Sequence, residues 1–346
     1  MESRVVQAGE LRVHYLEQGR GEPLILLHDW PQTSAAWRRI APLLANSYSL
    51  IAPDMRGMGE TTRTVDGYER DQLALDVLLL MDALRLPGAT LIGHGWGGMI
   101  ATKIALDHPD RVHRLVLLDA QTTGWPASAA HFNWFNDGNR AEQLFATRGT
   151  DVVRALIGGL AARLPRPPEC PLEFTSPAFA TLMPFALQDA GGDQRDGATL
   201  LDEYSAAFAS PSGRAALLAP FRALRFHRVL ADATAEHGER YAALSSAEVG
   251  AMWSAGQAGR EYLDFAPADR FKQYKGAVLW IYNQYLLDFA NAFMDDDGRP
   301  AGDPALESFL RHFPRVEVRG IDAGHYFIEE KPAITAQLMR KFLKKN

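Results

Sequence analysis

The sequence predicts an α/β fold in which a mostly parallel, doubly wound sheet is interrupted by an inserted helical domain. Short apolar runs alternate with amphipathic stretches up to about residue 120, which is the βαβ pattern of such a sheet. Residues 121–275 lack such strand-like apolar runs, and Ala-rich stretches alternate there with Pro and Gly. The alternation resumes at residue 276. We therefore expect a core of residues 1–120 and 276–346, with an α-helical cap of residues 121–275 between its halves.

Each core element follows from its local pattern. Residues 11–17 alternate in polarity, as a half-buried strand does, and residues 24–27 are continuously apolar, as a fully buried strand is. A helix over 34–44 is predicted to begin at a cap on Thr33 or Ser34. The other expected elements are strands at 48–53, 89–93, 114–119, 276–282 and 316–321, and helices at 70–86, from 96 towards 107, around 306–312 and at 332–343.

Composition and charge exclude several classes of protein. The 346 residues are 47% hydrophobic and 23% charged, which is ordinary for a soluble globular protein. A net charge of −6 argues against nucleic acids and anionic membranes as partners. The start of the chain has no apolar signal-peptide region, and no apolar run is long enough to span a bilayer. A single cysteine, Cys170, excludes an internal disulfide. We expect a cytoplasmic protein with a small-molecule substrate and leave a homodimer open.

The most informative motif is Gly93-His94-Gly95-Trp96-Gly97-Gly98, between an apolar strand and a helix. A strand, a tight glycine-rich turn and a helix form a nucleophile elbow, whose central residue normally carries the reactive side chain. Strain in such a turn costs about 1–3 kcal/mol for a residue with a Cβ, and glycine relieves most of it. Gly95 therefore has two interpretations: a lost nucleophile, or a site that works without a covalent intermediate.

Four blocks spread over the predicted core have the order and spacing of one enzyme family. They are His28-Asp29-Trp30-Pro31-Gln32-Thr33, Asp54-Met55-Arg56-Gly57-Met58-Gly59-Glu60-Thr61, the elbow block, and Ala323-Gly324-His325-Tyr326-Phe327-Ile328-Glu329-Glu330-Lys331-Pro332. Several ordered motifs are far more specific than a single glycine-rich turn. With them the chain resembles the epoxide hydrolase and haloacetate dehalogenase branch of the α/β-hydrolases. The resemblance implies that fold, with an α-helical cap. The sequence shows no cofactor motif, so we expect no metal or other cofactor.

The resemblance also implies catalytic roles. In this family an elbow aspartate attacks carbon to form an ester, a histidine activates water, and a second acid orients the histidine. Gly95 matches the nucleophile position and His325 matches the histidine. Asp119, at the end of the strand at 114–119, and Asp288 are the two candidates for the orienting acid. We favour Asp119 because its match needs no gap.

The resemblance also implies binding residues. The backbone N–H groups of Trp96 and of the Asp29–Trp30 turn match the oxyanion hole. Asp29 replaces a small residue there, which puts a carboxylate near the anion site and makes Asp29 a further candidate catalytic group. Tyr204 has two interpretations: a hydroxyl that points into the cavity, or a packing residue. The other expected binding or wall residues are Trp30, Trp96, His131 and Trp134.

One departure bears on the substrate. Trp96 and Met99 stand where acid-binding dehalogenases of the family carry arginines. The site would therefore lack the cationic side chains that bind the carboxylate of a haloacid.

Three functions stay open at this point. The first is an epoxide hydrolase-like hydrolase of a small or medium apolar molecule, inactivated by Gly95. The second is a natural enzyme that uses His325 as a general base for elimination, isomerisation, cyclisation or cofactor-free oxygenation. The third is a pseudoenzyme that only binds a ligand.

Overall fold

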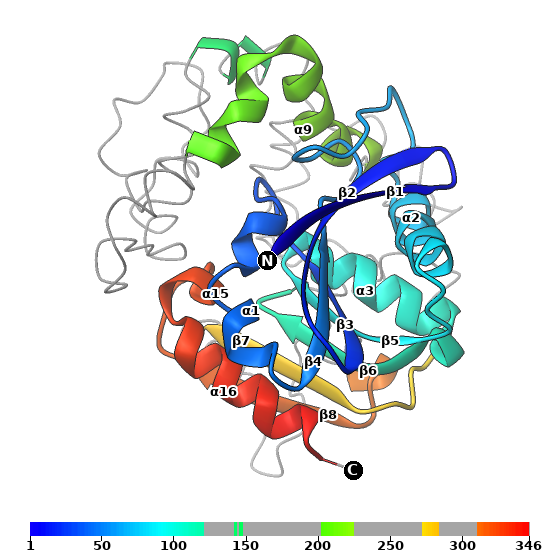
Figure 1. The fold of residues 1–346 in the computed structure, drawn as a ribbon, viewed down its shortest axis with the longest axis vertical. Coiled ribbons are helices and arrows are strands. Elements are labelled where there is room, and N and C mark those ends of the chain that lie inside the picture. Colours follow the sequence, from blue (N-terminus) through cyan, green and yellow to red (C-terminus); the bar gives the residue numbers. More distant parts are fainter. Residues whose placement is uncertain (121–141, 144, 148–201, 225–271, 284–309, 346) are drawn as a thin grey trace, which may run out of the picture.

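The computed structural model describes residues 1–120, 142–143, 145–147, 202–224, 272–283 and 310–345. A central sheet has the strand order β1-β2-β4-β3-β5-β6-β7-β8 (Figure 1). The strands are β1 (Glu2–Ala8), β2 (Leu11–Gly19), β3 (Glu22–Leu27), β4 (Tyr48–Pro53), β5 (Ala89–His94), β6 (Val112–Leu118), β7 (Val278–Asn283) and β8 (Val316–Ile321). β1 pairs antiparallel with β2 and β2 antiparallel with β4, and the other neighbours are parallel. The mostly parallel, doubly wound sheet that the sequence predicts is confirmed.

Helices cover both faces of this sheet, with α2 and α3 on one side and α1 and α16 on the other (Figure 1). Leu24 and Leu26 of β3 pack in one apolar cluster while Ile25 and Leu27 pack in the other, as expected where successive side chains point to opposite faces. The helices are η1 (Ser34–Trp37), α1 (Ala41–Leu44), α2 (Arg70–Ala83), α3 (Trp96–Asp107), η2 (Pro109–Arg111), η5 (Ala207–Ala209), α9 (Pro211–Leu224), α15 (Phe327–Glu330) and α16 (Pro332–Leu343).

Two segments differ from the predicted elements. The single helix expected over 34–44 is the short 3-10 helix η1 followed by α1, and Pro42 stands in the first turn of α1. Proline has no N–H to continue a preceding helix, so a new one starts there. The predicted cap is correct, since the Thr33 side chain accepts a hydrogen bond from Ala35 N. Strand β1 was not predicted because most of its residues are exposed and show no apolar face.

The described part of the predicted cap packs against the core around Trp30. The indole N–H of Trp30 donates to the carbonyl of Leu217 at 2.9 Å, and the ring of Phe145 lies 6.3 Å from the Trp30 ring and 4.9 Å from that of Phe208. Helix α9 (green) lies at the top of the view, above β1 and β2 and away from α16 (Figure 1). Within the described residues, no helix is long and apolar enough to cross a membrane.

Candidate active site

The candidate catalytic groups lie at one edge of the sheet. β3, β5 and β6 are adjacent and parallel, so their carboxyl ends meet at that edge, where open α/β sheets bind their ligands. Asp29 follows the end of β3 by two residues, Gly95 follows β5 directly, and Asp119 follows β6 directly. His325 stands in the loop between β8 and α15. The sheet therefore brings together four residues that are far apart in the sequence.

The elbow has its expected backbone but its side-chain space is filled from another strand. Gly95 precedes α3 with φ of 49° and ψ of −113°. A Cβ added at Gly95 would lie within 2.5 Å of Cγ, Oδ1 and Oδ2 of Asp29, closer than real Cβ atoms approach other atoms. The Asp29 carboxylate thus occupies the volume in which a side chain at position 95 would stand. The sequence placed Asp29 near the anion site but did not predict this overlap.

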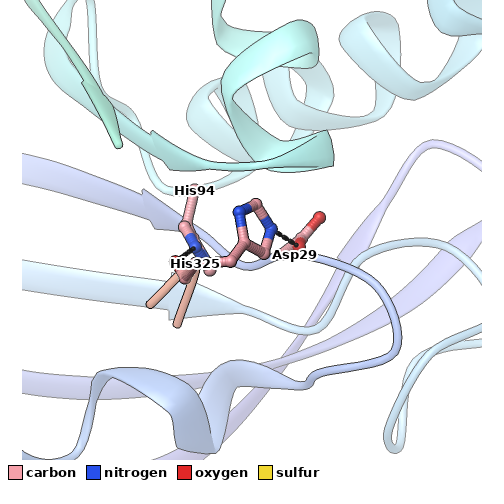
Figure 2. Close-up of side chains that lie close together, drawn as sticks. All are labelled: Asp29, His94 and His325. Atoms are coloured by element: carbon pink, nitrogen blue, oxygen red, sulfur yellow. Dashed lines mark hydrogen bonds and ion pairs between the residues drawn. The ribbon is translucent and has the colours of Figure 1, made fainter. Parts of the chain in front are cut away.

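The Asp29 carboxylate is held by two donors. Its Oδ1 accepts a hydrogen bond of 2.7 Å from the backbone N–H of Trp96, and its Oδ2 accepts one of 2.8 Å from Nε2 of His325. Trp96 is the first residue of α3, where the helix dipole favours a negative charge. Nδ1 of His325 in turn donates to Oδ2 of Asp119 at 2.6 Å. Figure 2 shows the His325 ring turned towards Asp29, with His94 on its other side.

Asp29, His325 and Asp119 form a hydrogen-bonded line, and its electrostatics favour a charged imidazole. Burial lowers the pKa of His325, but its hydrogen bonds to Asp119 and Asp29 and their charges outweigh that effect and raise the pKa to about 10. Burial alone would raise the pKa of Asp29, yet the His325 hydrogen bond and charge, helped by the Trp96 N–H, lower it. At neutral pH the resting site is therefore an imidazolium between two carboxylates.

Asp119 is fixed by the neighbouring strand β7. Its backbone is left-handed, with φ of 45°, and its N–H donates to the carbonyl of Ile281 at 2.7 Å. Asn283 donates to both carboxylate oxygens of Asp119, from its backbone N at 3.2 Å and from Nδ2 at 2.8 Å. Sequence reasoning missed Asn283, whose only signal was its place at the end of a strand beside β6. Asp119 is the acid that contacts His325, while Asp288, the alternative, lies outside the described residues.

The loop that carries Asp29 is held by side chains of its own motif. His28 donates from Nδ1 to the carbonyl of Asp29 at 2.8 Å and accepts from the backbone N of Met55 at Nε2. The N–H of Asp29 donates to Oε1 of Gln32 at 3.3 Å, and the N–H of Gln32 donates to the Asp29 carbonyl. Of the expected oxyanion donors, the Trp96 N–H lies at the carboxylate. The Asp29 N–H does not, because it is turned towards Gln32.

A second buried network lies behind His325. Nε2 of His94 donates to the carbonyl of His325 at 2.8 Å, and Nδ1 of His94 lies 3.1 Å from Oε1 of Gln32. Gln32 donates to Glu329 at 2.5 Å, and the Tyr204 hydroxyl donates to the same glutamate oxygen at 2.9 Å. The hydroxyl of Tyr204, which was considered for the cavity, belongs to a buried side chain and takes Glu329 as its acceptor. Sequence reasoning did not single out Gln32 or Glu329.

Burial sets the charge states in this network. It lowers the pKa of His94 to about 4, to which the positive charge of His325 also contributes, so His94 is neutral at pH 7. Burial raises the pKa of Glu329 to about 7 against the opposing hydrogen bonds from Tyr204 and Gln32. The network is therefore close to neutral, in contrast to the charged line beside it.

Asp29, His94 and His325 form the one group of three among the described residues whose ligand atoms could surround a metal ion, all within 4.8 Å of one another. These atoms already have protein partners. Nε2 of His325 donates a hydrogen bond to Oδ2 of Asp29, and Nε2 of His94 donates one to the backbone carbonyl of His325. The three residues fit a hydrogen-bonded acid–base site better than a metal centre.

The expected wall residues near the elbow belong to one apolar cluster. Trp30, Trp96 and Met99 are buried, and all three belong to the same apolar cluster as Phe145 and Phe208 of the inserted segment. Trp30 and Trp96, predicted as wall residues, lie beside the elbow in this cluster. His131 and Trp134 lie outside the described residues.

Comparisons with known proteins agree with this fold. A family profile described as the alpha/beta hydrolase fold matches residues 22–177. The soluble epoxide hydrolase of Corynebacterium sp. (strain C12) is 43% identical over 108 residues, which cover 31% of this chain and 38% of that protein. The fluoroacetate dehalogenase of Burkholderia sp. is 38% identical over 123 residues, covering 34% and 40%. The matched segment thus spans about two fifths of the length of these relatives.

The fold extends over the whole chain in solved structures. The epoxide hydrolase CorEH, solved without ligand, superposes with a TM-score of 0.69 at 20% identity, covering 99% of this chain and 98% of that one. At this identity the likeness concerns the fold alone, while the profile matches residues 22–177, which carry the oxyanion loop and the elbow. The chain has the α/β-hydrolase fold, and about a third of its length is similar in sequence to an epoxide hydrolase and to a fluoroacetate dehalogenase.

Proposed function

We propose that this protein is an active hydrolase of the epoxide hydrolase type, whose substrate is a small or medium-sized, largely apolar organic molecule. The observation that carries the proposal is the line of Asp29, His325 and Asp119, with Asp29 also on the Trp96 N–H. Although residue 95 is glycine, the site retains a carboxylate at the elbow, a histidine and an acid that orients it. Opening of an epoxide needs these groups.

Each group has a task in that reaction. The imidazolium of His325 can donate its Nε2 proton to the ring oxygen as the C–O bond breaks, and so prevent a free alkoxide from accumulating. Asp119 holds Nδ1 and keeps the ring in its orientation. The Trp96 N–H, at the start of α3, stabilises negative charge at the carboxyl group next to it.

The surroundings favour an uncharged substrate. Trp96 and Met99 offer no cation to a substrate carboxylate, and Trp30 adds a further apolar wall. A second anion beside Asp29 and Asp119 would also be repelled. We therefore prefer an epoxide to a haloacid, although relatives with either activity match the chain. We further propose that residues 121–275 form the cap over this site, which the contact between Trp30 and Leu217 supports.

The other interpretations have weaker support. A general base must be neutral to accept a proton, and a pKa of about 10 keeps His325 protonated at neutral pH, which weighs against elimination or isomerisation through a free imidazole. A binding-only protein, or one inactivated at position 95, has no need for a carboxylate held between an N–H and an imidazolium.

A panel of styrene-type and aliphatic epoxides tests the proposal, with diol formation as the readout. We expect the wild-type protein to hydrolyse at least one of them and His325→Ala to lose that activity. His113→Ala, which changes an exposed histidine on β6, serves as the matched control and should retain it. If no epoxide in the panel is hydrolysed by the folded wild-type protein, the proposed function is wrong.

A further inference from the structure

We propose that Asp29 is the nucleophile of this enzyme: the attacking carboxylate stands on the oxyanion loop after β3 instead of on the elbow after β5. Because residue 95 is glycine, the volume above the elbow is free for this carboxylate. The inference rests on the proposed function, and it adds a covalent step on a named residue to it.

Side chains at positions 29 and 95 compete for the same volume. Any side chain at position 95 would overlap Cγ and both oxygens of Asp29, because even a Cβ there would lie within 2.5 Å of them. The pairing of Leu27 on β3 with Gly93 on β5 brings the two strand ends level, so a side chain two residues past β3 can reach over the elbow. One carboxylate fits this volume, and here Asp29 provides it.

The two hydrogen bonds of the Asp29 carboxylate also suit an attacking group. An attacking carboxylate needs one oxygen held by a backbone donor, where negative charge develops later, and the other beside the histidine that will activate water. Asp29 has both, with Oδ1 on the N–H of Trp96 and Oδ2 on Nε2 of His325. The elbow N–H and the imidazole therefore serve a carboxylate that approaches from the neighbouring strand.

The first chemical step is a displacement at carbon. Oδ2 of Asp29 forms a bond to an epoxide carbon, the C–O bond of the ring breaks, and its electron pair goes to the ring oxygen. The Nε2 proton of His325 passes to that oxygen, which leaves a hydroxyalkyl ester and a neutral imidazole. Esterification removes one of the two negative charges that hold the proton on His325, so the same step that needs the proton also releases it.

The second step restores the enzyme. Neutral His325 takes a proton from water, and the hydroxide attacks Cγ of Asp29, while the Trp96 N–H stabilises the oxyanion. The bond between Cγ and the alkyl oxygen breaks, and that oxygen receives the proton from His325 to complete the diol. The Asp29 carboxylic acid then returns its proton to His325. The carboxylate and the imidazolium are restored, with one oxygen of water incorporated.

Trapping of the ester tests the assignment. His325→Gln removes both the proton donor of the first step and the group that activates water for the second. In a mildly acidic buffer the solvent can supply the first proton, while water is still not activated for the second step. We therefore expect this variant to accumulate an adduct with 4-nitrostyrene oxide, seen by intact-mass measurement. Tryptic mapping should place the adduct on Asp29 in the peptide of residues 21–38. The matched variant is His325→Gln with Asp29→Asn, which keeps the shape of the side chain and should form no adduct.

The outcomes separate this inference from the proposed function. If the wild-type protein hydrolyses the epoxide and the adduct maps to another residue or does not form, Asp29 is not the nucleophile and the proposed function stands. If the wild-type protein hydrolyses no epoxide, both fall.

A positional exchange gives a second test. Gly95→Asp alone should lose activity, because its side chain overlaps Asp29. Gly95→Asp with Asp29→Gly returns the carboxylate to the elbow and should exceed the single variant by at least tenfold. Full activity in Gly95→Asp with Asp29→Asn, matched by full activity in Asp29→Asn alone, would show that position 29 is dispensable and overturn the inference.

Discussion

His94 and His325 lie side by side, with ring centroids 4.8 Å apart, yet the pKa of His94 is lowered to about 4 and that of His325 is raised to about 10. His94 is buried and His325 is partly buried, and the loss of solvation lowers both values. The difference lies in their partners: His325 donates to the carboxylates of Asp29 and Asp119, whereas His94 faces a backbone carbonyl and the amide of Gln32. Carboxylate contacts, and not burial, decide which histidine carries charge.

The two buried acids repeat this contrast. Asp29 is bonded to the imidazolium and its pKa is lowered, whereas Glu329 is bonded to an amide and a phenol and its pKa is raised to about 7. One network is charged and suited to proton transfer, and the other is nearly neutral and suited to holding the oxyanion loop and the Tyr204 segment in place. The variants below should therefore separate loss of chemistry from loss of support.

The largest effect is expected for Asp29→Asn in the charged line. The amide cannot attack an epoxide carbon, so we expect turnover to fall by about 10⁶-fold, the scale of losing a nucleophile. Steady-state diol formation measures it, and circular dichroism checks that the isosteric variant is folded. A loss of less than tenfold would remove Asp29 from the chemistry.

Asp119→Asn should have the next largest effect. The imidazole would lose the acid that fixes its orientation and tautomer, so we expect turnover to fall by about 10²–10⁴-fold with little change in KM. Asn283→Ala, which removes one donor to Asp119, should cause a smaller loss in the same direction. Equal activity of Asp119→Asn and wild type would return the role to Asp288.

Removing one carboxylate should reduce the difference between the pKa values of His325 and His94. In Asp29→Asn the pKa of His325 should fall by roughly 1–3 units from its wild-type value, while His94 stays neutral across the titration. Nitrogen-15 NMR of labelled histidines measures both. An unchanged His325 titration in this variant would mean that Asp29 does not hold the proton.

The same shift predicts a dependence of stability on pH. Because the pKa of His325 is raised on folding from 6.5 to about 10, its stabilisation is complete below pH 6.5 and is lost as the pH rises towards 10. Denaturant unfolding at several pH values should show this fall in wild type and a smaller one in Asp29→Asn. Parallel curves for the two proteins would contradict it.

Glu329→Gln should have the smallest effect on activity, within about tenfold, because the Glu329 carboxylate accepts from Gln32 and Tyr204 and not from His325. Its folded pKa of about 7 lies above 4.5, so wild-type stability should fall as the pH rises from 4.5 to 7, by at most ~3 kcal/mol. Glu329→Gln should remove this fall. A drop in turnover like that of Asp119→Asn would place Glu329 in the chemistry.

Much of the core could be predicted because its strands are apolar or alternating runs between turns. The ranges 48–53 and 316–321 match β4 and β8 in full, and the elbow glycines identify the turn after β5. The relation of Asp29 to Gly95 could not be predicted. It depends on the register of β3 against β5 and on the direction of one side chain across that gap, and neither is written in the local sequence.

The contacts of Asp119 and Tyr204 show the same limit. Asp119 was identified from its strand end, but its partner Asn283 lies on a strand 164 residues further along the chain. Tyr204 had two interpretations, and only packing reveals that Glu329 is its acceptor. Local patterns locate the residues at strand ends, whereas the pairing among them is set by tertiary structure.

The central claim is that the oxygen transferred to substrate comes from Asp29. A single turnover in water enriched in oxygen-18, with enzyme in excess over epoxide, tests it most directly by mass spectrometry of the diol and of the tryptic peptides. We predict an unlabelled diol and one oxygen-18 on Asp29 in the peptide of residues 21–38, with none in the elbow peptide of residues 86–103, which contains no acidic residue. A diol that carries oxygen-18, with Asp29 unlabelled, would mean that water attacks the epoxide directly and would contradict the account.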